Sequence, residues 1–394
     1  MRVVVVSAWE PWRTSDGAAF VLDHQLRELA ARHDLTVLAG GAPRAEAAVP
    51  VDARGRYGSA KVRWFGTSAP ALADYAGRLV WSARHAEPAH VRYVERPALL
   101  AAYDEAAAGA DVVHLHGWGT ARLAARVPGT RAVHVAIDPW AANAANRRVS
   151  ALRAPLERRQ LDRIAQHERR HYLSARAVVV VTDEDAELVG QSVPGAPLVV
   201  VANGVVAGAE PPQVSATPPV LGFHGVFDSR ANVDAARVLV QEIWPRVRAE
   251  VPDATVLLAG RRPNREVRRL AGDGVVLRAD VPDIRQVLVE MSVHVDWMTS
   301  GAGIKNKVLE AMAAGRPVVA SEAGARGIGS GHGLLVAATA EVAAARIVRL
   351  LRSPAALREA GATARSRVVT EFSWAANARQ IEEIWNRVAR VSAG

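Results

Sequence analysis

The sequence predicts an α/β fold built from two doubly wound parallel-sheet domains in tandem. Short, nearly continuous apolar runs such as Val3–Val6 and Ala177–Val181 alternate with longer segments of helical periodicity such as Ala18–Arg32. Strands that are apolar throughout and separated by helices indicate parallel sheets covered on both faces. The same alternation begins again after residue 218, and 394 residues are too many for one ordinary hydrophobic core.

Each predicted strand is a short apolar run bounded by turn or polar residues, and each predicted helix has apolar residues at helical spacing. The strands predicted in the first half are Val3–Val6, Leu35–Leu38, Val112–His114, Ala132–Val135 and Ala177–Val181, with helices at Ala18–Arg32 and Leu152–Leu173. The strands predicted in the second half are Val220–Phe223, Thr255–Leu258, Val275–Leu277, Val293–Val295 and Pro317–Ala320. The helices predicted there are Asn232–Glu250, Arg265–Leu270, Ile284–Met291, Lys305–Ala314 and Ala340–Leu351.

The boundary between the two domains is expected just after residue 203. The dipeptide Asn203-Gly204 is typical of a tight turn, and the segment Val206–Pro219 carries four prolines among small and polar residues. We therefore expect one domain over 1–203, a linker over 204–218 and a second domain over 219–374. A last helix within 375–394 lacks a partner strand and can pack on either domain, including a return to the first.

Composition and charge narrow the classes of partner. The absence of cysteine excludes a disulfide framework, a thiolate metal site and a cysteine nucleophile, and it fits a reducing cytoplasm. The net charge of +9 attracts anions, but the arginines are scattered among acidic residues and no base-reading motif is present. We expect phosphorylated small molecules rather than nucleic acid as partners.

The chain's beginning predicts a protein without a membrane-spanning or targeting segment. The first apolar run, Val3–Val6, is broken at Ser7, which is too early for a signal peptide or a transmembrane helix. Peripheral contact with a membrane stays open, as does the choice between a monomer and a homodimer. The expected location is the cytoplasm.

The loop after the predicted strand Val293–Val295 is the richest in candidate ligand-binding groups. It reads WMTSGAGIKNKVLE, with Gly301 and Gly303 before a helix and with Lys305 and Lys307 at the start of that helix. Glycines let a ligand approach the backbone, and the first amides of a helix attract anions. A diphosphate cradle is one interpretation, and a glycine turn before a surface helix with two solvated lysines is the other.

Glu310 makes the ligand-binding interpretation stronger. It lies in a helix whose buried face consists of Val308, Leu309, Met312 and Ala313. A carboxylate in such a helix needs a partner, and the diol of a ribose offers two hydroxyl donors. The alternative partner is a lysine or arginine in an internal ion pair.

These residues belong to a segment with a recognisable resemblance. The run GAGIKNKVLEAMAAGRPVVAS resembles the donor-binding signature of the family-4 retaining glycosyltransferases of GT-B fold. LGFHGVFDSRANVDAARVLVQEIWPRVRAEVPDATVLLAG is similar to that family's first unit of the donor domain, and VVANGV, ADVVHLHG and ARAVVVVTDEDAELV extend the resemblance. It implies two Rossmann-like domains facing across a cleft, the first on the acceptor side and the second holding a nucleotide sugar. No motif of the family could be placed in residues 41–110, and this region is expected to shape acceptor choice.

The resemblance implies a modified donor site. The family's motif has two glutamates, of which the second falls on Glu310, implied to hold the nucleotide ribose, and the first falls on Ala302. One carboxylate near the donor sugar is therefore missing. Gly301, Gly303 and Ile304 complete the loop that the resemblance places against the donor.

The resemblance also implies where the diphosphate charge is neutralised. Of the family's basic pair after the first donor-domain strand, only Arg230 is present, so Lys305 or Lys307 is expected to supply the second charge. Arg261 follows the next strand and is a further phosphate candidate. In the first domain, Gly17 matches the family's glycine loop near the donor phosphates.

Two residues are implied as catalytic and four as lesser candidates. His134 is expected at the end of its strand and aligns with the family histidine that contacts the donor sugar or the attacking hydroxyl, with Asp138 close behind it as a proton acceptor. His116 could face the acceptor, although a structural role fits it equally, and His224 is a lesser candidate. Trp12 and Trp140, which belong to ten tryptophans in the chain, could stack on an acceptor or fill the core.

The expected activity follows from the resemblance and the absence of a metal-binding acidic pair. We expect transfer of a hexose-type sugar from a nucleotide-diphosphate sugar, with UDP-sugars before GDP- or dTDP-sugars, to a hydroxyl of a small molecule or glycan. Retention of configuration is implied by the family, and no metal or other cofactor is expected. The alternatives are another GT-B enzyme of sugar nucleotides, such as an epimerase, and a non-catalytic sugar-nucleotide-binding protein.

Overall fold

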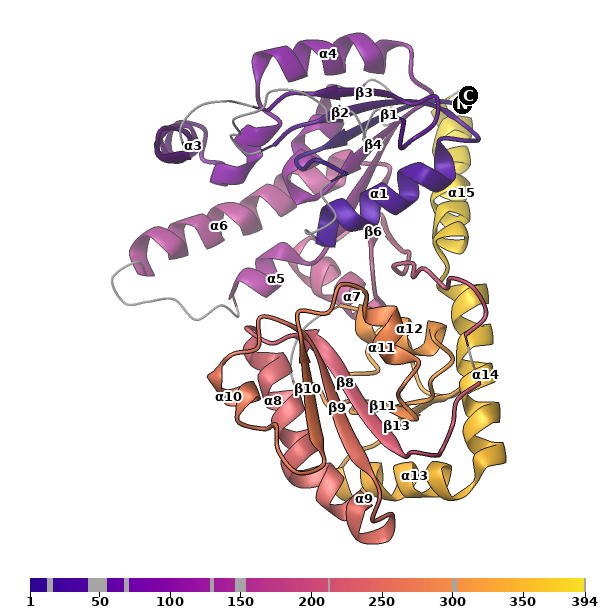
Figure 1. Ribbon diagram of the computed structural model, residues 1–394. Helices are drawn as coiled ribbons and strands as arrows, with labels where there is room; N and C mark the ends of the chain where they lie inside the picture. Colours follow the sequence, from indigo (N-terminus) through magenta and orange to yellow (C-terminus); the bar gives the residue numbers. More distant parts are fainter. Residues whose placement is uncertain are drawn as a thin grey trace. The chain divides into compact units, whose positions relative to one another are not determined.

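The computed structural model describes residues 1–12, 17–41, 55–66, 71–127, 131–145, 154–211, 213–299 and 303–392. It consists of two compact units, the first formed by Met1–Ala202 with Asn377–Gly394 and the second by Asn203–Ala376. Each unit contains one sheet flanked by helices (Figure 1). No helix in the described ranges is long and apolar enough to cross a membrane.

The sheet of the first unit has seven described strands in the order β3-β2-β1-β4-β5-β6-β7, and every neighbouring pair is parallel. The strands are β1 (Arg2–Ser7), β2 (Asp34–Ala39), β3 (Lys61–Trp64), β4 (Val112–His116), β5 (Ala132–Ile137), β6 (Ala177–Val180) and β7 (Leu198–Val200). The helices are α1 (Gly17–Leu29), α3 (Ala71–His85), η1 (Ala89–Tyr93), α4 (Pro97–Ala108), η2 (Trp118–Arg126), α5 (Trp140–Ala145), α6 (Ala154–His171), η4 (Tyr172–Ser174) and α7 (Asp183–Ser192).

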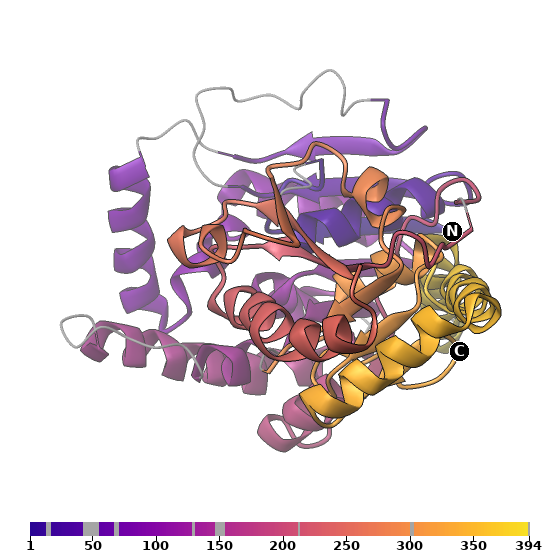
Figure 2. The same ribbon diagram turned by 60° about the horizontal axis from the view of Figure 1, so that its bottom comes forward.

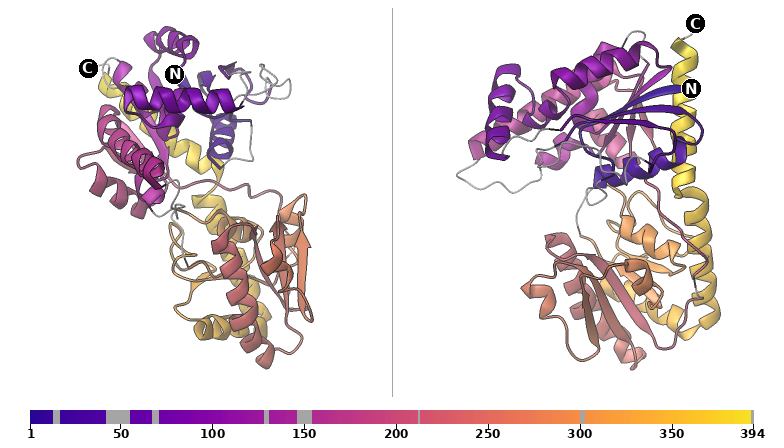
Figure 3. Two further views of the ribbon diagram at one scale, coloured as in Figure 1. Left: turned by 90° about the vertical axis from the view of Figure 1, so that its left-hand side faces the viewer. Right: turned by 45° about the horizontal axis from the view of Figure 1, so that its top comes forward.

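Both faces of this sheet are covered because its strands are apolar at every position. Alternate residues of a strand point to opposite faces. In β1, Val3 and Val5 pack in one apolar cluster with α1, whereas Val4 and Val6 pack in another with α4. The two helices accordingly lie on opposite faces of the strands in Figure 1 and in the right-hand view of Figure 3.

The last helix, α15 (Trp374–Ser392), contributes most of its length to the first unit. Trp385 is fully buried beside α1, and its indole N–H donates to Nδ1 of His114 in β4 at 3.2 Å. Asn377 accepts a hydrogen bond from Gln25 at 3.0 Å. This helix therefore closes the core of a sheet whose strands come from the beginning of the chain.

The sheet of the second unit has six described strands in the order β10-β9-β8-β11-β12-β13, again all parallel. The strands are β8 (Val220–Val226), β9 (Thr255–Arg261), β10 (Val275–Ala279), β11 (Val293–Asp296), β12 (Val318–Ala320) and β13 (Leu334–Val336). The helices are α8 (Arg230–Val238), η5 (Leu239–Ile243), α9 (Trp244–Glu250), α10 (Arg265–Arg268), α11 (Ile284–Leu288), α12 (Asn306–Ala313), α13 (Ala340–Arg352) and α14 (Pro354–Glu371).

One face of this second sheet is apolar and the other carries polar side chains toward its carboxyl edge. Leu221 and Phe223 of β8, with Val293 and Val295 of β11, join the large apolar cluster that includes α8, η5, α9 and α13. Those helices gather on one side of the sheet in Figure 2. The intervening residues, among them His224 and His294, therefore project to the opposite face.

The predicted fold class is confirmed, and most predicted elements are present with ends shifted by a few residues. The structure adds strands β3, β7 and β13, which the sequence analysis did not identify, and helices α3 and α4 in the region 41–110. The predicted single helix Asn232–Glu250 is three consecutive segments, because a π-helical turn at η5 separates α8 from α9.

Candidate functional site

The strand order of the second unit identifies its candidate ligand site. From β8 the chain adds β9 and β10 on one side and then returns to place β11 on the other. In open parallel sheets, ligands bind at the carboxyl ends of the two strands where this reversal occurs. For this unit those are the ends of β8 at Val226 and of β11 at Asp296, and α12 begins ten residues after β11, at Asn306.

Glu310 lies on α12 beside this edge and is paired with a histidine. Its Oε2 is 2.8 Å from Nε2 of His224, the residue two places before the end of β8. The Glu310 side chain is 36% exposed, so the carboxylate is held on the protein side and open on the other. The internal partner expected from the sequence was a lysine or arginine, and the structure places a histidine there instead.

A second histidine stands behind the first. Nδ1 of His224 is 3.0 Å from Nε2 of His294 in the neighbouring strand β11, and both rings are buried. With Glu310 ionised, His224 donates from Nε2 and its Nδ1 accepts from Nε2 of His294. Burial, reinforced by His224 and Lys307, holds the pKa of His294 well below its usual value. The neutral His294 ring thus fixes which nitrogen of His224 carries the proton aimed at Glu310.

Lys307 is one turn before Glu310 on α12 and points back over the sheet edge. Its ammonium group donates to Oδ1 of Asn232 and lies 4.6 Å from the centre of the Phe223 ring. Burial lowers the pKa of Lys307, and the nearby charges of Asp296 and Glu310 oppose that effect. Lys307 is therefore a half-buried cation at the carboxyl end of β8.

Glycines near the carboxyl ends of β8 and β9 permit close approaches at the switch point. A β-carbon on Gly225 would lie 3.1 Å from the Asn232 amide and 3.3 Å from Nζ of Lys307. Across the strand pair, a β-carbon on Gly260 would lie 1.8 Å from the carbonyl oxygen of Gly225. These two glycines bring backbone and cation together at the switch point.

Asp296, the last residue of β11, is a buried acid that was not among the predicted site residues. It is fully buried, and neither of its carboxylate oxygens makes a hydrogen bond of good geometry to a described residue. Burial raises its pKa, and Lys307, His224 and Lys305 oppose that rise. The signal in the sequence was a lone aspartate after an apolar strand, which identifies a strand-end residue but not its depth.

The glycine loop is only partly within the described residues. Gly301 and Ala302 lie outside them. Gly303 has a φ of 71°, a left-handed conformation that favours glycine, and its carbonyl accepts a hydrogen bond of 2.9 Å from the buried ammonium of Lys305. Ile304 is half-buried beside them. Lys305 therefore braces the loop from inside, whereas Lys307 lies on the β8 side.

The two arginines expected near the diphosphate are on the surface. Arg230, the first residue of α8, is 68% exposed and forms ion pairs with Asp234 at 2.9 Å and Glu266 at 3.3 Å. Arg261 is exposed at the end of β9. A ligand would have to draw Arg230 away from two carboxylates, so Lys307 is the better-placed cation.

The first unit has its own switch point, between β1 and β4. Gly17 begins α1 there, and His116 ends β4. Nε2 of His116 is 3.0 Å from the carbonyl oxygen of Ala18, and burial lowers the pKa of His116 to about 4. A neutral His116 that donates to this carbonyl holds the first turn of α1, which is a structural role. Trp12 is half-buried against the apolar cluster under α1.

The expected position of His134 is wrong. The strand β5 continues to Ile137, so His134 lies in its middle and is fully buried, with its ring 4.8 Å from that of Tyr172. Neither ring nitrogen makes a hydrogen bond of good geometry to a described residue. Burial, with the charge of His167, lowers the pKa of His134 to about 3. The predicted strand ended at Val135, but β5 continues through a bulge between Val135 and Ile137.

The true end of β5 has the features of a functional edge. Ile137 has a φ of 70°, which is strained for a β-branched residue, and such strain concentrates at functional sites. Asp138 follows and is exposed. Trp140 begins α5 and stacks on Trp118, the residue after Gly117 at the end of β4, with ring centres 3.8 Å apart.

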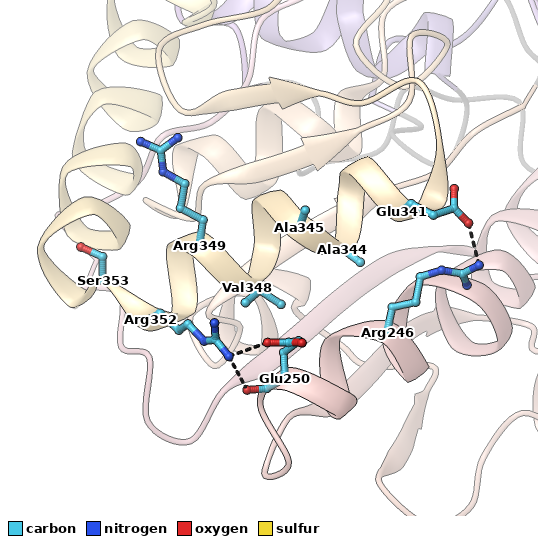
Figure 4. A pocket seen from close by; sticks show the side chains of 9 residues that line it. All are labelled: Arg246, Glu250, Glu341, Ala344, Ala345, Val348, Arg349, Arg352 and Ser353. Carbon is cyan, nitrogen blue, oxygen red and sulfur yellow. Dashed lines mark hydrogen bonds and ion pairs between the residues drawn. The ribbon is translucent and has the colours of Figure 1, made fainter.

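A groove of about 610 Å³ elsewhere on the second unit lies between α9 and α13 (Figure 4). Its charged walls are occupied by internal ion pairs, Arg246 with Glu341 and Arg352 with Glu250, each at 2.6 Å. Arg352 ends α13 and Glu250 ends α9 shortly before β9 begins, so this pair belongs to the amino side of the sheet. It is therefore distinct from the edge that carries Glu310.

Comparison with known proteins identifies the family and the fold of the chain. The family model described as "Glycosyl transferases group 1" matches residues 218–353, and that described as "Glycosyltransferase Family 4" matches residues 15–207. No curated protein matches this chain in sequence.

Three solved structures of similar fold are distant from this chain in sequence. A sucrose-phosphate synthase from Thermosynechococcus elongatus is 18% identical, with a TM-score of 0.66 over 98% of this chain and 99% of that chain. HepE from Anabaena, in complex with UDP and glucose, is 14% identical, with a TM-score of 0.63 over 98% and 99%. An α,α-trehalose 6-phosphate synthase from Burkholderia multivorans is 13% identical, with a TM-score of 0.59 over 100% and 99%.

The two family matches together span both units, and both sheets have the doubly wound parallel topology that the GT-B fold requires. The expected fold and enzyme class are thereby confirmed. The chain has the GT-B fold and belongs to the group 1 glycosyltransferases, which are transferases of class EC 2.4.

Proposed function

We propose that the protein transfers a hexose-type sugar from a nucleotide-diphosphate sugar to a hydroxyl of a small molecule or glycan, with retention and without a metal ion in the transfer step. The observation that carries the proposal is the Glu310–His224 pair at the β8/β11 switch point, with Lys307 one turn away on the same helix. UDP-sugars are the first donors to test, because the similar HepE structures contain UDP or UDP-glucose. GDP- and dTDP-sugars are the alternatives.

Glu310 is assigned to the nucleotide ribose. His224 holds Oε2, which leaves the partly exposed side of the carboxylate to accept hydrogen bonds from a ribose diol. Because the histidine pair fixes the carboxylate in place, little side-chain entropy remains to be lost when the nucleotide binds.

Lys307 and the first amides of α12 are assigned to the diphosphate. Loss of a nucleoside diphosphate from the donor sugar builds negative charge on the leaving group, and a cation beside a helix N-terminus stabilises that charge without a metal ion. Gly225 and Gly303 leave room for the phosphates to approach the backbone. The departing phosphate then takes the acceptor proton in a front-face attack that retains configuration.

The acceptor side is assigned to the carboxyl edge of the first unit. Asp138 is exposed at the end of β5, next to the strained Ile137, and it is our candidate to orient the attacking hydroxyl. The half-buried Trp140 offers an aromatic edge for an acceptor. His134 lies too deep to contact a substrate in this arrangement.

The activity test is to incubate the full chain with UDP-, GDP- and dTDP-sugars and a library of hydroxyl acceptors, and to identify the products by mass spectrometry. Binding of each nucleotide is measured separately by titration calorimetry. Glu310→Gln removes charge with little change in volume, and we expect the nucleotide dissociation constant to rise by about 10- to 100-fold, the equivalent of about 1.5–3 kcal/mol for a charged hydrogen bond. Glu250→Gln is the matched control, because Glu250 is a paired surface glutamate near the other edge of the sheet.

The outcomes separate the candidate functions. Unchanged nucleotide affinity in folded Glu310→Gln would remove Glu310 from the site. Tight nucleotide binding with neither transfer nor donor hydrolysis would identify a sugar-nucleotide-binding protein instead of an enzyme acting on these donors. Conversion of one nucleotide sugar into another would identify an epimerase.

A further inference from the structure

The first unit contains a cluster of metal-ligating side chains that the proposed function does not use. His167 and His171 are four residues apart on α6 and therefore share one face of the helix. Glu87 lies between α3 and η1 and faces both rings. Nδ1 of His167 is 2.6 Å from one oxygen of Glu87, and Nε2 of His171 is 2.9 Å from the other.

The segment that carries Glu87 is fixed against α6 by hydrogen bonds that do not involve the three candidate ligand side chains. The hydroxyl of Ser82 donates to the carbonyl oxygen of Glu87 at 2.5 Å, and Arg163 on α6 donates to the same hydroxyl at 2.7 Å. Gln160, also on α6, accepts from the backbone N–H of Ala89 at 3.3 Å. The three candidate ligands are thus preorganised by contacts that do not depend on their own charges.

Without a cation the cluster has a protonation problem. Nε2 of His167 lies 3.1 Å from the carbonyl oxygen of Trp118, while Nδ1 faces the carboxylate of Glu87. Neither acceptor carries a hydrogen when Glu87 is ionised, so both nitrogens of a fully buried ring must be protonated. The result is an imidazolium ring buried in the unit, and taking such a charge out of water is costly.

A divalent cation resolves this conflict. A neutral His167 can donate from Nε2 to the Trp118 carbonyl and give the lone pair of Nδ1 to the metal, which is the usual arrangement of a metal-bound histidine and its outer hydrogen bond. The two facing histidine nitrogens and a Glu87 oxygen all lie within 4.8 Å of one another. Ligands around a tetrahedral zinc ion are roughly 3.4 Å apart. The two short contacts to Glu87, at 2.6 and 2.9 Å, would therefore widen around the ion, and the remaining separations, at most 4.8 Å, would close.

We propose that Glu87, His167 and His171 form a binding site for one divalent transition-metal cation, with Zn²⁺ as the best-matched ion. Two imidazoles and one carboxylate suit Zn²⁺ and its neighbours rather than Mg²⁺ or Ca²⁺, which prefer oxygen ligands. The His171 side chain is 17% exposed, which gives the ion a route from solvent and leaves a position for water.

The bound ion has a structural role and is separate from sugar transfer. It ties α6 to the segment at Glu87, and through His167 it holds the carbonyl of Trp118, which stacks on Trp140 at the carboxyl edge of the sheet. The inference rests on the first unit alone, so it stands or fails independently of the donor site.

The test uses the tag-free full chain after dialysis against a chelator. Calorimetry with Zn²⁺ alone should give one equivalent bound in the micromolar range or tighter, and Co²⁺ should give the visible absorption of a four- or five-coordinate site. Adding Zn²⁺ should raise the melting temperature. His171→Ala and Glu87→Gln should each weaken Zn²⁺ binding at least tenfold, and His85→Ala, which removes an exposed histidine of the same unit, should not.

Folding is checked by circular dichroism in chelator, where His171→Ala should keep the wild-type spectrum because its ring is not part of the core. Two results overturn the proposal: no stoichiometric Zn²⁺ uptake by the chelator-treated wild type, or uptake that persists unchanged in His171→Ala and Glu87→Gln. Either would make the cluster an ion pair between a buried imidazolium and a carboxylate.

Discussion

The two histidines behind Glu310 give a quantitative prediction about coupling. His224→Leu removes the bond to Glu310, worth about 1.5 kcal/mol because the Glu310 side chain is 36% exposed, and leaves the buried Nε2 of His294 without a partner at a cost of about 1–2 kcal/mol. We therefore expect a loss of about 3 kcal/mol. His294→Leu removes the bond between the rings and leaves Nδ1 of His224 alone, for a loss of about 2 kcal/mol.

The double variant should cost less than the sum of the two. His224→Leu combined with His294→Leu removes both rings, so neither ring is left with a newly unpaired nitrogen. The double variant loses only the two hydrogen bonds, about 1.5 kcal/mol for the bond to Glu310 and about 0.5 kcal/mol for the neutral bond between the rings, for a total of about 2 kcal/mol. The sum of the single costs is about 5 kcal/mol, which gives a coupling of about 3 kcal/mol between residues in direct contact.

The assay is native-state hydrogen exchange of the backbone amides of β8 and β11, which reports the opening free energy of the second unit without a contribution from the first. Stability costs that add to within about 0.5 kcal/mol would refute the hydrogen-bonded chain. As a second readout, His224→Leu should weaken binding of the nucleotide because Glu310 is no longer held. Equal nucleotide affinity in His224→Leu and wild type would show that the pair does not position Glu310.

Two further predictions concern buried groups of the first unit. Burial raises the pKa of Glu168 from 4.5 to about 7 against the backbone donors of Ala141 and Trp140, so the folded chain keeps a proton that the unfolded chain has released, and stability falls as pH rises through this range. At 1.36 kcal/mol per pH unit, the loss of folding free energy reaches about 3 kcal/mol. Glu168→Gln should remove this pH dependence when stability is measured by urea unfolding from pH 4.5 upward. Parallel pH profiles of wild type and variant would contradict the assignment. His134 is buried and makes no well-formed hydrogen bond to a described residue. His134→Leu should therefore change the free energy of unfolding by no more than about 1 kcal/mol and turnover by no more than about threefold. A loss of about 100-fold in turnover at unchanged nucleotide affinity would restore its catalytic role.

Local sequence patterns were sufficient to predict most strands and helices and to identify the region of the donor site. Apolar runs separated by segments of helical periodicity identified five strands in each half. A strand that is buried on both faces is apolar at nearly every position, so it is visible as a continuous run in the sequence. Strands such as Lys61–Trp64, which alternates exposed and half-buried residues, lacked that pattern and were missed. Glu310 could be singled out because it interrupts the buried face of α12.

The depth of a side chain along its strand could not be predicted in the same way. His134 was placed at a strand end because the strand was predicted to stop at Val135, but β5 continues through a bulge after Val135 to Ile137, whose backbone is left-handed. Hydrogen bonding with β6 sets that extension, and a single sequence does not show which strand lies alongside.

By itself, the sequence determined two parallel-sheet domains, a linker composition between them, and a glycine-rich loop leading to a helix that carries Lys307 and Glu310. These are properties of contiguous residues, which periodicity and turn chemistry express directly. Only the tertiary structure decided that Glu310 meets His224, 86 positions earlier, and that Glu87 meets His167, 80 positions later. Such partners depend on the order and register of strands and helices, and that order is fixed when distant apolar faces pack together rather than by any local run of residues.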